Sequence, residues 1–283
     1  MTVVKSVADV RKAVKAARAK GLNIGFVPTM GALHEGHASL VRHSTKECGY
    51  TVVSIYVNPT QFGAGEDFDK YPRTLDADTK LVDKAGGSLI FAPTDREMYP
   101  NYRGADGTWV DLVGLTKQLE GASRPHHFRG VTTVVTKLFN IVQPDKAYFG
   151  QKDFQQCRVI QRMAADLDMP LEVVMCQTVR EANGLAMSSR NVYLNPEQRK
   201  QALCLSQTLT KARELYARGE RNAEKISAAM RELIASHPLA RIDYVEIVDH
   251  DTLASVAEIN ESSVAVLAVF VGTTRLIDNG YLK

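Results

Sequence analysis

Long apolar runs and an N-terminal leader are both missing from this sequence of 283 residues. The longest uninterrupted apolar run, Val264 to Val271, falls well short of the roughly 20 residues that span a bilayer. We interpret it as a buried strand and expect no membrane partner. The N-terminus lacks the apolar stretch of a signal peptide, because charged residues such as Lys5 and Asp9 interrupt it. We therefore do not expect export by that route.

Paired cysteines and an excess of one charge are missing as well. Cys48, Cys157, Cys176 and Cys204 form no C-x-x-C pair, which argues against a zinc ribbon and a disulfide framework. The 35 Lys and Arg residues nearly balance the 32 Asp and Glu residues, and no basic tail collects the net charge of +3. We expect no nucleic-acid partner. Unpaired cysteines fit a reducing compartment, so we predict a cytoplasmic protein.

The chain does have enough apolar residues, 45%, to build a core for each of about two domains. An apolar run at residues 24–27, a helical pattern at 38–47 and a β-rich run at 51–57 read as strand, helix and strand. The alternation continues through residues 74–84, 88–92, 131–141, 147–149, 154–167 and 171–176. This pattern predicts an α/β fold, a Rossmann-like parallel sheet with helices on both faces.

The pattern changes after Val179, at a turn-rich stretch from Glu181 to Gly184. Helices are expected to begin near Asn195 and Asn222. Three strands are expected at residues 243–248, 264–271 and 274–278. We predict a first domain at residues 1–178 and a smaller α+β C-terminal domain at residues 179–283, which covers the site.

The loop after the strand at 24–27 contains the spacing H-x-G-H, from His34 to His37. An open α/β sheet places its ligand at such a loop. Exposed N–H groups at the start of the following helix would attract an anion such as phosphate, and Gly36 would allow it to approach closely. Two imidazoles three residues apart point the same way and can each donate a hydrogen bond to it.

Two other interpretations of this loop remain open. Either histidine can simply cap a turn, which is the usual role of an isolated histidine in such a place. A metal site formed by His34, Glu35 and His37 is also conceivable, but zinc-binding helices space their histidines four apart, and no third ligand is evident.

A second candidate functional segment, Gly150 to Asp153, again lies between a predicted strand and helix. Gly150 would permit a tight turn, and Lys152 offers a positive charge for phosphate. A lone lysine in such a loop is usually solvated. Its expected position beside the first loop in a parallel sheet is what favours a functional role.

Two further polar segments follow the same reasoning. Met187 to Arg190 offers two hydroxyls and a guanidinium that suit a departing pyrophosphate, although a capped turn before Pro196 would explain it too. Asn58 and Gln61 follow the strand at 51–57 with amides that can orient a small substrate, although alone this segment reads as a turn.

Taken together, these segments resemble the pantothenate synthetase (pantoate–β-alanine ligase) family, a branch of the H-x-G-H nucleotidyltransferase superfamily. The resemblance runs over nearly the whole chain. The matching motifs are VPTMGALHEGH (27–37), VSIYVNPTQF (53–62), YPRTL (71–75), LEGASRPHHFRGV (119–131), FGQKDFQQ (149–156), GLAMSSRN (184–191) and TRLIDN (274–279).

The resemblance implies a set of site residues. His37 matches the family's proton donor, and His34 and Lys152 are the other catalytic candidates. Gln61 and Gln156 match the glutamines that hold pantoate, Gln61 also matches a β-alanine contact, and Asn58 joins them as a substrate-binding candidate. The implied ATP-binding residues are Met30, Gly31, Ala32, Leu33, His34, Glu35, Gly36, His37, Gly150, Gln151, Lys152, Asp153, Val179, Met187, Ser188, Ser189 and Arg190.

The implied reaction condenses pantoate with β-alanine through a pantoyl adenylate and releases AMP and pyrophosphate. ATP would enter with Mg²⁺, and the family implies a homodimer. Two positions depart from the family pattern: Thr60 stands where many members have Met, and Gln151 where Glu is expected. Asp76 and Asp78 are candidate magnesium ligands, and the ligand set stays open.

Three alternatives to this function are kept. Another adenylyltransferase of the superfamily would show a basic acceptor pocket in place of paired glutamines. A regulatory nucleotide-binding module would release no pyrophosphate from MgATP. A metallohydrolase would contain a bound metal.

Overall fold

The computed structural model describes residues 1–101 and 107–283. The chain divides into two compact units. The first consists of Met1–Gly150 and Val159–Cys176, and the second of Gln151–Arg158 and Gln177–Lys283. This division falls close to residue 178 but assigns a short segment after Gly150 to the second unit. The two predicted domains and their roles stay predictions.

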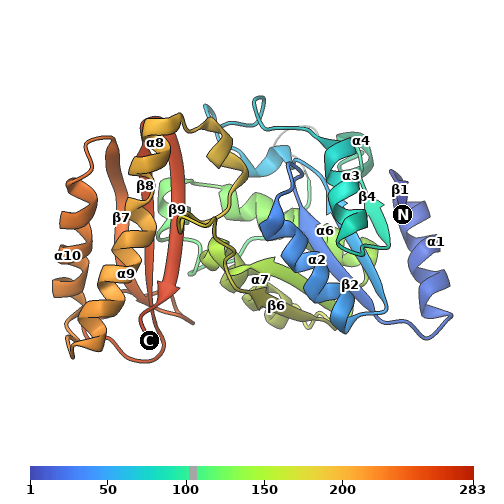
Figure 1. The fold of residues 1–283 in the computed structure, drawn as a ribbon. Helices are drawn as coiled ribbons and strands as arrows, with labels where there is room; N and C mark the ends of the chain where they lie inside the picture. Colours follow the sequence, from blue (N-terminus) through green and yellow to red (C-terminus); the bar gives the residue numbers. More distant parts are fainter. Residues whose placement is uncertain (102–106) are drawn as a thin grey trace. The chain divides into compact units, whose positions relative to one another are not determined.

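The first unit is built on a sheet of six parallel strands (Figure 1). Their order across the sheet is β1 (Thr2–Val4), β4 (Leu89–Phe91), β3 (Tyr50–Ile55), β2 (Ile24–Thr29), β5 (Lys146–Gly150) and β6 (Glu172–Cys176). The central strands are apolar along their length because both faces are buried. The predicted parallel sheet is confirmed, and only β1, three residues long, gave no sequence signal.

Helices cover the sheet on both faces. Helices α1 (Val7–Arg18) and α6 (His127–Val142) pack on each other and on β2, while α2 (Glu35–Glu47) packs on β2, β3 and β5 and touches α3 (Leu75–Lys84). Helix α7 (Phe154–Asp166) follows β5. The shorter helical segments of this unit are η1 (Pro59–Gln61), α4 (Asp95–Met98) and α5 (Glu120–Ser123).

The strand order places a topological switch point between β2 and β5. From β2 the chain builds outward through β3 and β4, and it then crosses to add β5 and β6 on the other side of β2. In open α/β sheets, ligands bind at the carboxyl ends of the strands where the order reverses. Both predicted phosphate-binding segments leave the sheet there, one after β2 and the other after β5.

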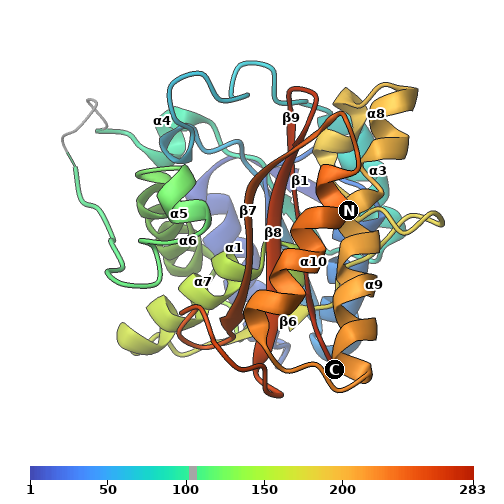
Figure 2. The same ribbon diagram turned by 90° about the vertical axis from the view of Figure 1, so that its left-hand side faces the viewer.

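The second unit contains an antiparallel sheet of β7 (Ala240–Asp249), β8 (Ser263–Val271) and β9 (Thr274–Tyr281). Figure 2 shows α9 (Cys204–Ala217) and α10 (Ala223–Ala235) running side by side, and both contact this sheet. Central β8 is almost entirely buried, as expected for the longest apolar run. The helix expected from Asn195 is interrupted, giving α8 (Pro196–Gln201) before α9.

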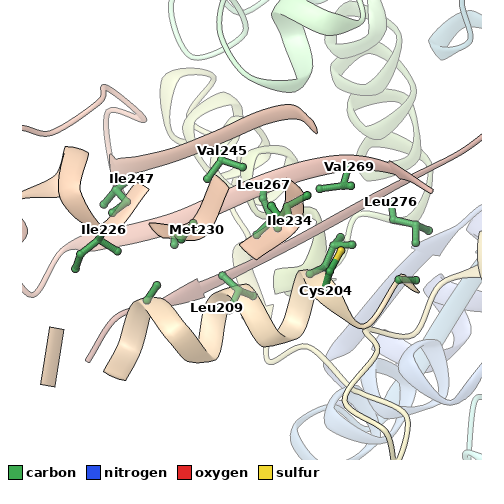
Figure 3. Packing of buried hydrophobic residues seen from close by; sticks show 14 of the residues in the cluster. Cys204, Leu209, Ile226, Met230, Ile234, Val245, Ile247, Leu267, Val269 and Leu276 are labelled. Atoms are coloured by element: carbon green, nitrogen blue, oxygen red, sulfur yellow. The ribbon is translucent and has the colours of Figure 1, made fainter. Parts of the chain in front are cut away.

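The core of the second unit lies between these two helices and the sheet. Met230 and Ile226 of α10 and Leu209 of α9 face Val245 and Leu267 of the sheet (Figure 3). Each of these five side chains is at most 2% exposed. The predicted α+β composition of this part is therefore confirmed.

Two general properties concern membranes and thiols. In the described part of the chain, no helix has the length and apolar character needed to cross a membrane. None of the four cysteines forms a disulfide, and all four are buried. Burial raises the pKa of Cys176 to about 11 and that of Cys204 to about 12, and it also raises the pKa of Cys48.

Candidate active site

The loop at residues 30–37, named the histidine loop, is fixed to helix α3 by a buried carboxylate. Asp78 of α3, 1% exposed, accepts hydrogen bonds from the backbone N–H groups of Ala32 (3.1 Å) and Leu33 (2.8 Å). The chain turns there through positive φ angles of 87° at Gly31 and 49° at Ala32. A Cβ atom at Gly31 would lie 3.2 Å from Asp78 Oδ2, so glycine serves both the turn and the close approach.

Asp78 was one of two candidate magnesium ligands, and its contacts do not fit that role. Its Oδ1 also accepts the Thr74 hydroxyl at 3.1 Å, so both carboxylate oxygens are used inside the protein. The other candidate, Asp76, is exposed in the first turn of α3. Among the described residues, no group of three or more His, Cys, Asp or Glu side chains is placed to hold a metal ion.

The two histidines of the loop cap the start of α2. Nδ1 of His34 accepts the N–H of Gly36 at 3.1 Å, and Nδ1 of His37 accepts the N–H of His34 at 3.3 Å. The ring centroids are 4.2 Å apart, so the expected pairing of the imidazoles is confirmed. Because Nδ1 acts as acceptor, a neutral ring carries its proton on Nε2. Capping therefore leaves Nε2 as the donor atom of each ring.

The same capping overturns one expectation about the backbone. The N–H groups of Gly36, His37 and Ala38 all donate to His34, the first to its ring and the other two to its carbonyl oxygen. The sequence suggested that these N–H groups would be exposed to an anion, but they are used in capping the helix. Helix α2 also begins at Glu35, three residues before the predicted start, because a histidine was not recognised as its N-cap. Glu35 itself forms an ion pair with Arg42.

Gln61 ends the short helix η1 and is buried, with 8% of its surface exposed. Its Nε2 donates to Met30 Sδ in the histidine loop at 3.2 Å, and its Oε1 accepts from Asn58 Nδ2 at 3.1 Å. The structure thus brings three predicted site residues together. A Cβ at Gly130 of α6 would lie 2.4 Å from the carbonyl oxygen of Thr60, so only glycine lets α6 pack this closely on η1.

The backbone of Gln61 is held by residues to which the sequence reasoning assigned no role. His127 Nδ1 lies 2.9 Å and Arg124 Nη2 3.4 Å from the Gln61 carbonyl oxygen. Arg124 also donates to both carboxylate oxygens of Glu66, at 2.8 and 2.5 Å. Arg124 and His127 fall inside the motif LEGASRPHHFRGV, and this pair of basic residues was the available signal.

The charges in this network shift two pKa values. Burial, assisted by the charge of Arg124, lowers the pKa of His127 to about 4. Burial alone would raise the pKa of Glu66, but its hydrogen bonds and ion pair with Arg124 outweigh this and hold it below the usual range. His127 is therefore neutral and Glu66 ionised at pH 7.

In the second unit, Lys152 lies in the short helix η2 (Gln151–Asp153). Asn279, 3% exposed at the end of β9, donates from Nδ2 to the carbonyl oxygens of Gln151 (2.9 Å) and Lys152 (2.8 Å). Gln151 Nε2 donates to Asn279 Oδ1 at 3.3 Å, and Lys152 Nζ lies 3.4 Å from a carboxylate oxygen of Asp153. Gln151, one of the two residues that depart from the family pattern, therefore helps to stabilise this turn.

Gly150 precedes this turn but does not form it. It is the last residue of β5 and pairs with Cys176 in the sheet. The predicted tight turn at Gly150 is wrong. An added Cβ would have no atom within 4 Å, so neither packing nor backbone conformation requires glycine there.

The remaining predicted residues of the second unit lie on a short hairpin and on α7. The Met187 N–H donates to the carbonyl oxygen of Val179 at 3.0 Å, which brings these two together across the turn near Gly184. Ser188 accepts the Arg190 N–H at 3.2 Å and so caps the short helix η3 (Ser189–Tyr193), as the alternative interpretation required. Ser189, Arg190 and, on α7, Gln156 are half-buried.

A sequence model of the family described as pantoate–β-alanine ligase matches residues 2–281 of the chain. The chain belongs to the pantoate–β-alanine ligase family. A family member from Pelotomaculum thermopropionicum, named pantothenate synthetase, is 55% identical over 282 residues, which cover 100% of this chain and 99% of the relative. Another pantothenate synthetase, from Moorella thermoacetica, is 54% identical over 283 residues, with coverage of 100% and 99%.

Solved structures of pantoate–β-alanine ligases agree with this fold. Pantothenate synthetase from Thermus thermophilus matches with a TM-score of 0.94 and 44% identity, covering 100% of this chain and 99% of that one. The enzyme from Francisella tularensis, solved with β,γ-ATP and β-alanine, matches with a TM-score of 0.81 and 30% identity, with coverage of 100% and 98%. The Rossmann-like ligase fold is therefore shown along the whole chain.

Proposed function

We propose that this chain condenses (R)-pantoate with β-alanine to pantothenate in two steps driven by ATP. In the first, a pantoate carboxylate oxygen attacks the α-phosphorus of ATP, which forms pantoyl adenylate and releases pyrophosphate. In the second, the amine of β-alanine attacks the acyl carbon and displaces AMP. The full-length match to the ligase family carries this proposal.

The histidine loop supplies the chemistry expected for the first step. Nε2 of His34 and of His37 are the donor atoms of two neighbouring rings, 4.2 Å apart between centroids. Negative charge grows on the phosphoryl oxygens as phosphorus becomes pentacoordinate, and fixed donors stabilise that charge without reorganising. We assign His37 as the proton donor and His34 as its neighbour in this role. The loop residues from Met30 to Gly36 would line the nucleotide.

The second unit would bind the rest of ATP. Lys152 and Arg190 carry the positive charges that suit the triphosphate and the departing pyrophosphate, with Ser188 and Ser189 as hydroxyl donors. The remaining candidates for ATP contacts are Gly150, Gln151, Asp153, Val179 and Met187. Asn279 donates to two backbone carbonyl oxygens of Gln151–Asp153, named the lysine segment, so these oxygens do not face an anion bound there. This supports a role of the segment in binding an anion.

The glutamines would hold pantoate. A neutral amide can orient a carboxylate without holding its charge so tightly that its attack is blunted. We assign Gln61 and Gln156 to pantoate, Gln61 also to β-alanine, and Asn58 to the support of Gln61. The Francisella structure with β-alanine shows that a family member binds this second substrate.

Three finer properties belong to the same proposal. ATP would enter as its Mg²⁺ complex, with the metal bound mainly by the phosphates, since Asp78 is occupied by the histidine loop. The family implies a homodimer, which sedimentation equilibrium would detect. Four cysteines without a disulfide suit a reducing cytoplasm.

Isotope exchange of pyrophosphate into ATP tests the proposal. We expect exchange that requires both pantoate and Mg²⁺. Pantoate labelled with ¹⁸O in its carboxylate should transfer one label to AMP once β-alanine is added. Stoichiometric ADP or unlabelled AMP would overturn the adenylate route. Exchange with a phosphorylated acceptor would favour another adenylyltransferase, and ATP binding without exchange a regulatory module. Hydrolysis dependent on a bound protein metal would favour the metallohydrolase.

A further inference from the structure

The amide of Asn58 has an orientation that its backbone neighbours determine. Its Oδ1 faces the N–H of Thr60 at 3.4 Å, and its Nδ2 faces the carbonyl oxygen of Gly130 at 3.2 Å. A backbone N–H can only donate and a carbonyl oxygen can only accept. The two ends of this amide therefore cannot be exchanged.

Two hydroxyls reinforce this orientation. The Tyr99 hydroxyl donates to Asn58 Oδ1 at 2.9 Å, and the Thr60 hydroxyl donates to the same oxygen at 3.0 Å. Asn58 is 1% exposed, so these bonds replace water. Thr60 thus contributes a hydroxyl donor where many members of the family have a methionine.

The orientation of Asn58 then sets that of Gln61. Asn58 Nδ2 has two hydrogens, one directed to Gly130 and the other to Gln61 Oε1 at 3.1 Å. Gln61 must therefore direct its Nε2 to the opposite side, where the partner is Met30 Sδ at 3.2 Å. A thioether is a weak acceptor, so this buried NH₂ group is a donor suited to a stronger acceptor.

The backbone of the same residue is fixed from another side. Arg124 can only donate, so His127 Nε2, 3.2 Å from Arg124 Nη1, is the acceptor. His127 Nδ1 consequently carries the proton and donates to the Gln61 carbonyl oxygen. Position and polarity of Gln61 are thus controlled by separate sets of residues.

We propose that Tyr99 and Thr60 are positioning residues that act through Asn58 to make Gln61 a hydrogen-bond donor toward an acceptor oxygen of the acid substrate. This inference rests on the proposed function, in which Gln61 holds pantoate. Neither hydroxyl needs to touch the substrate. Because both hydroxyls donate to the same oxygen, each can partly replace the other.

A double-mutant cycle tests the two hydroxyls. We expect Tyr99→Phe and Thr60→Val each to raise the pantoate KM by about threefold, the loss of one neutral hydrogen bond. The double variant should raise it by more than the product of the two, while the ATP KM changes less than twofold. When Thr60→Ser replaces Thr60→Val in the double variant, the retained hydroxyl should return the pantoate KM to its value in Tyr99→Phe alone. Tyr56→Phe is the matched control, because its hydroxyl donates to Asp95 and not to Asn58.

A pair of substitutions at Asn58 separates polarity from packing. Asn58→Asp places an acceptor opposite Gln61 Oε1, so Gln61 must reverse its amide and present oxygen to pantoate. Asn58→Ala removes the side chain but leaves Gln61 able to rotate. We expect the pantoate KM to rise more in Asn58→Asp than in Asn58→Ala, although aspartate is nearer to asparagine in size. Because the carboxylate would also face the carbonyl oxygen of Gly130, the ATP KM is measured beside the pantoate KM: a purely structural role predicts that both constants rise together.

The outcomes separate a failure of the proposed function from a failure of the positioning role of Tyr99 and Thr60. If the unmodified chain shows no pantoate-dependent pyrophosphate exchange, the proposed function falls and this assignment falls with it. If exchange is normal but Asn58→Ala is the more damaging variant, or if ATP and pantoate KM rise together, the positioning role alone is overturned. Where Asn58→Asp does not fold, the Tyr99→Phe and Thr60→Val cycle decides.

Discussion

The two units hold their candidate phosphate-binding segments by opposite kinds of hydrogen bond. In the first, the buried carboxylate of Asp78 accepts two backbone N–H groups of the histidine loop. In the second, the buried amide of Asn279 donates to the carbonyl oxygens of Gln151 and Lys152. One segment has its backbone donors withdrawn, and the other its backbone acceptors.

If both segments bind phosphate as proposed, this difference means that different groups would contact the anion in each unit. Most N–H groups from Ala32 to Ala38 already donate to Asp78 or to His34, so under the proposed function the imidazole Nε2 atoms would be the donors to a phosphate. In the lysine segment, two carbonyl oxygens that would repel a phosphate accept hydrogen bonds from Asn279 instead. Their dipoles then do not oppose the attraction between a phosphate and the charge of Lys152. Substitutions in each unit should therefore affect the reaction differently.

The largest effect is expected at the histidine pair. His37→Ala and His34→Ala should each slow adenylate formation by about 10² to 10³, the usual loss for one transition-state donor. Single-turnover formation of pantoyl adenylate measures this. His43→Ala, also on α2 but exposed, is the control and should react normally. Normal adenylation by either loop variant would reduce that histidine to a helix cap.

Arg190 should affect only one half of the reaction. If it stabilises the departing pyrophosphate, Arg190→Ala slows adenylation from ATP by about 10² or more, while preformed pantoyl adenylate and β-alanine still react at a nearly normal rate. The two half-reactions are measured separately by rapid quench. Arg218→Ala, exposed at the end of α9, serves as control. Equal impairment of both steps would contradict the leaving-group role.

Acid should destabilise the first unit through His127. Its pKa is about 4 when folded against an ordinary 6.5, so between these values the unfolded chain binds a proton that the folded chain does not. Stability is therefore retained above about pH 6.5 and lost as the pH falls toward 4, by about 3 kcal/mol in total.

Urea unfolding followed through Trp109 measures this loss, because it is the one tryptophan of the chain and stacks with Arg129 in the first unit. His127→Gln should remove the pH dependence between 4 and 6.5, whereas His237→Gln in the turn that follows α10 should keep it. An unchanged slope in His127→Gln would mean that other groups cause it. Glu66 contributes mainly below this window, because its folded pKa is lowered.

A smaller effect is expected at Asn279. Asn279→Ala frees two carbonyl oxygens beside Lys152 and should raise the ATP KM by about tenfold, with the pantoate KM unchanged. Asn260→Ala, in an exposed turn of the same unit, is the control. Steady-state kinetics with each substrate varied in turn gives both constants. A parallel rise in both would show that Asn279 supports the whole unit rather than the lysine segment.

The sequence predicted the layers of the fold better than the details of the site. Periodicity identifies β2, β3 and β8 because burial dictates their apolar residues. It could not show that Asp78 binds a loop 45 residues away in sequence, because such a contact has no local pattern. For the same reason, the hold of His127 on Gln61 was missed, although both lie in quoted motifs.

The backbone assignments failed where side chains replaced the usual signals. Histidine is an unusual N-cap, so the start of α2 was placed late. Gly150 was taken for a turn residue because glycine is common in turns, yet it is the end of a strand. Whether the predicted site residues act together is a question for the kinetics above.

The four buried thiols have a practical consequence for spectroscopy. Reagents that alkylate cysteine need an accessible thiolate, and burial with a raised pKa opposes both requirements at Cys48, Cys176 and Cys204. The native chain should therefore give little background with maleimide dyes. A cysteine introduced at exposed Ala64 and another at exposed Ala182 would carry a donor and an acceptor fluorophore, one on each unit. The efficiency of energy transfer would report any change in the distance between the two fluorophores as substrates are added.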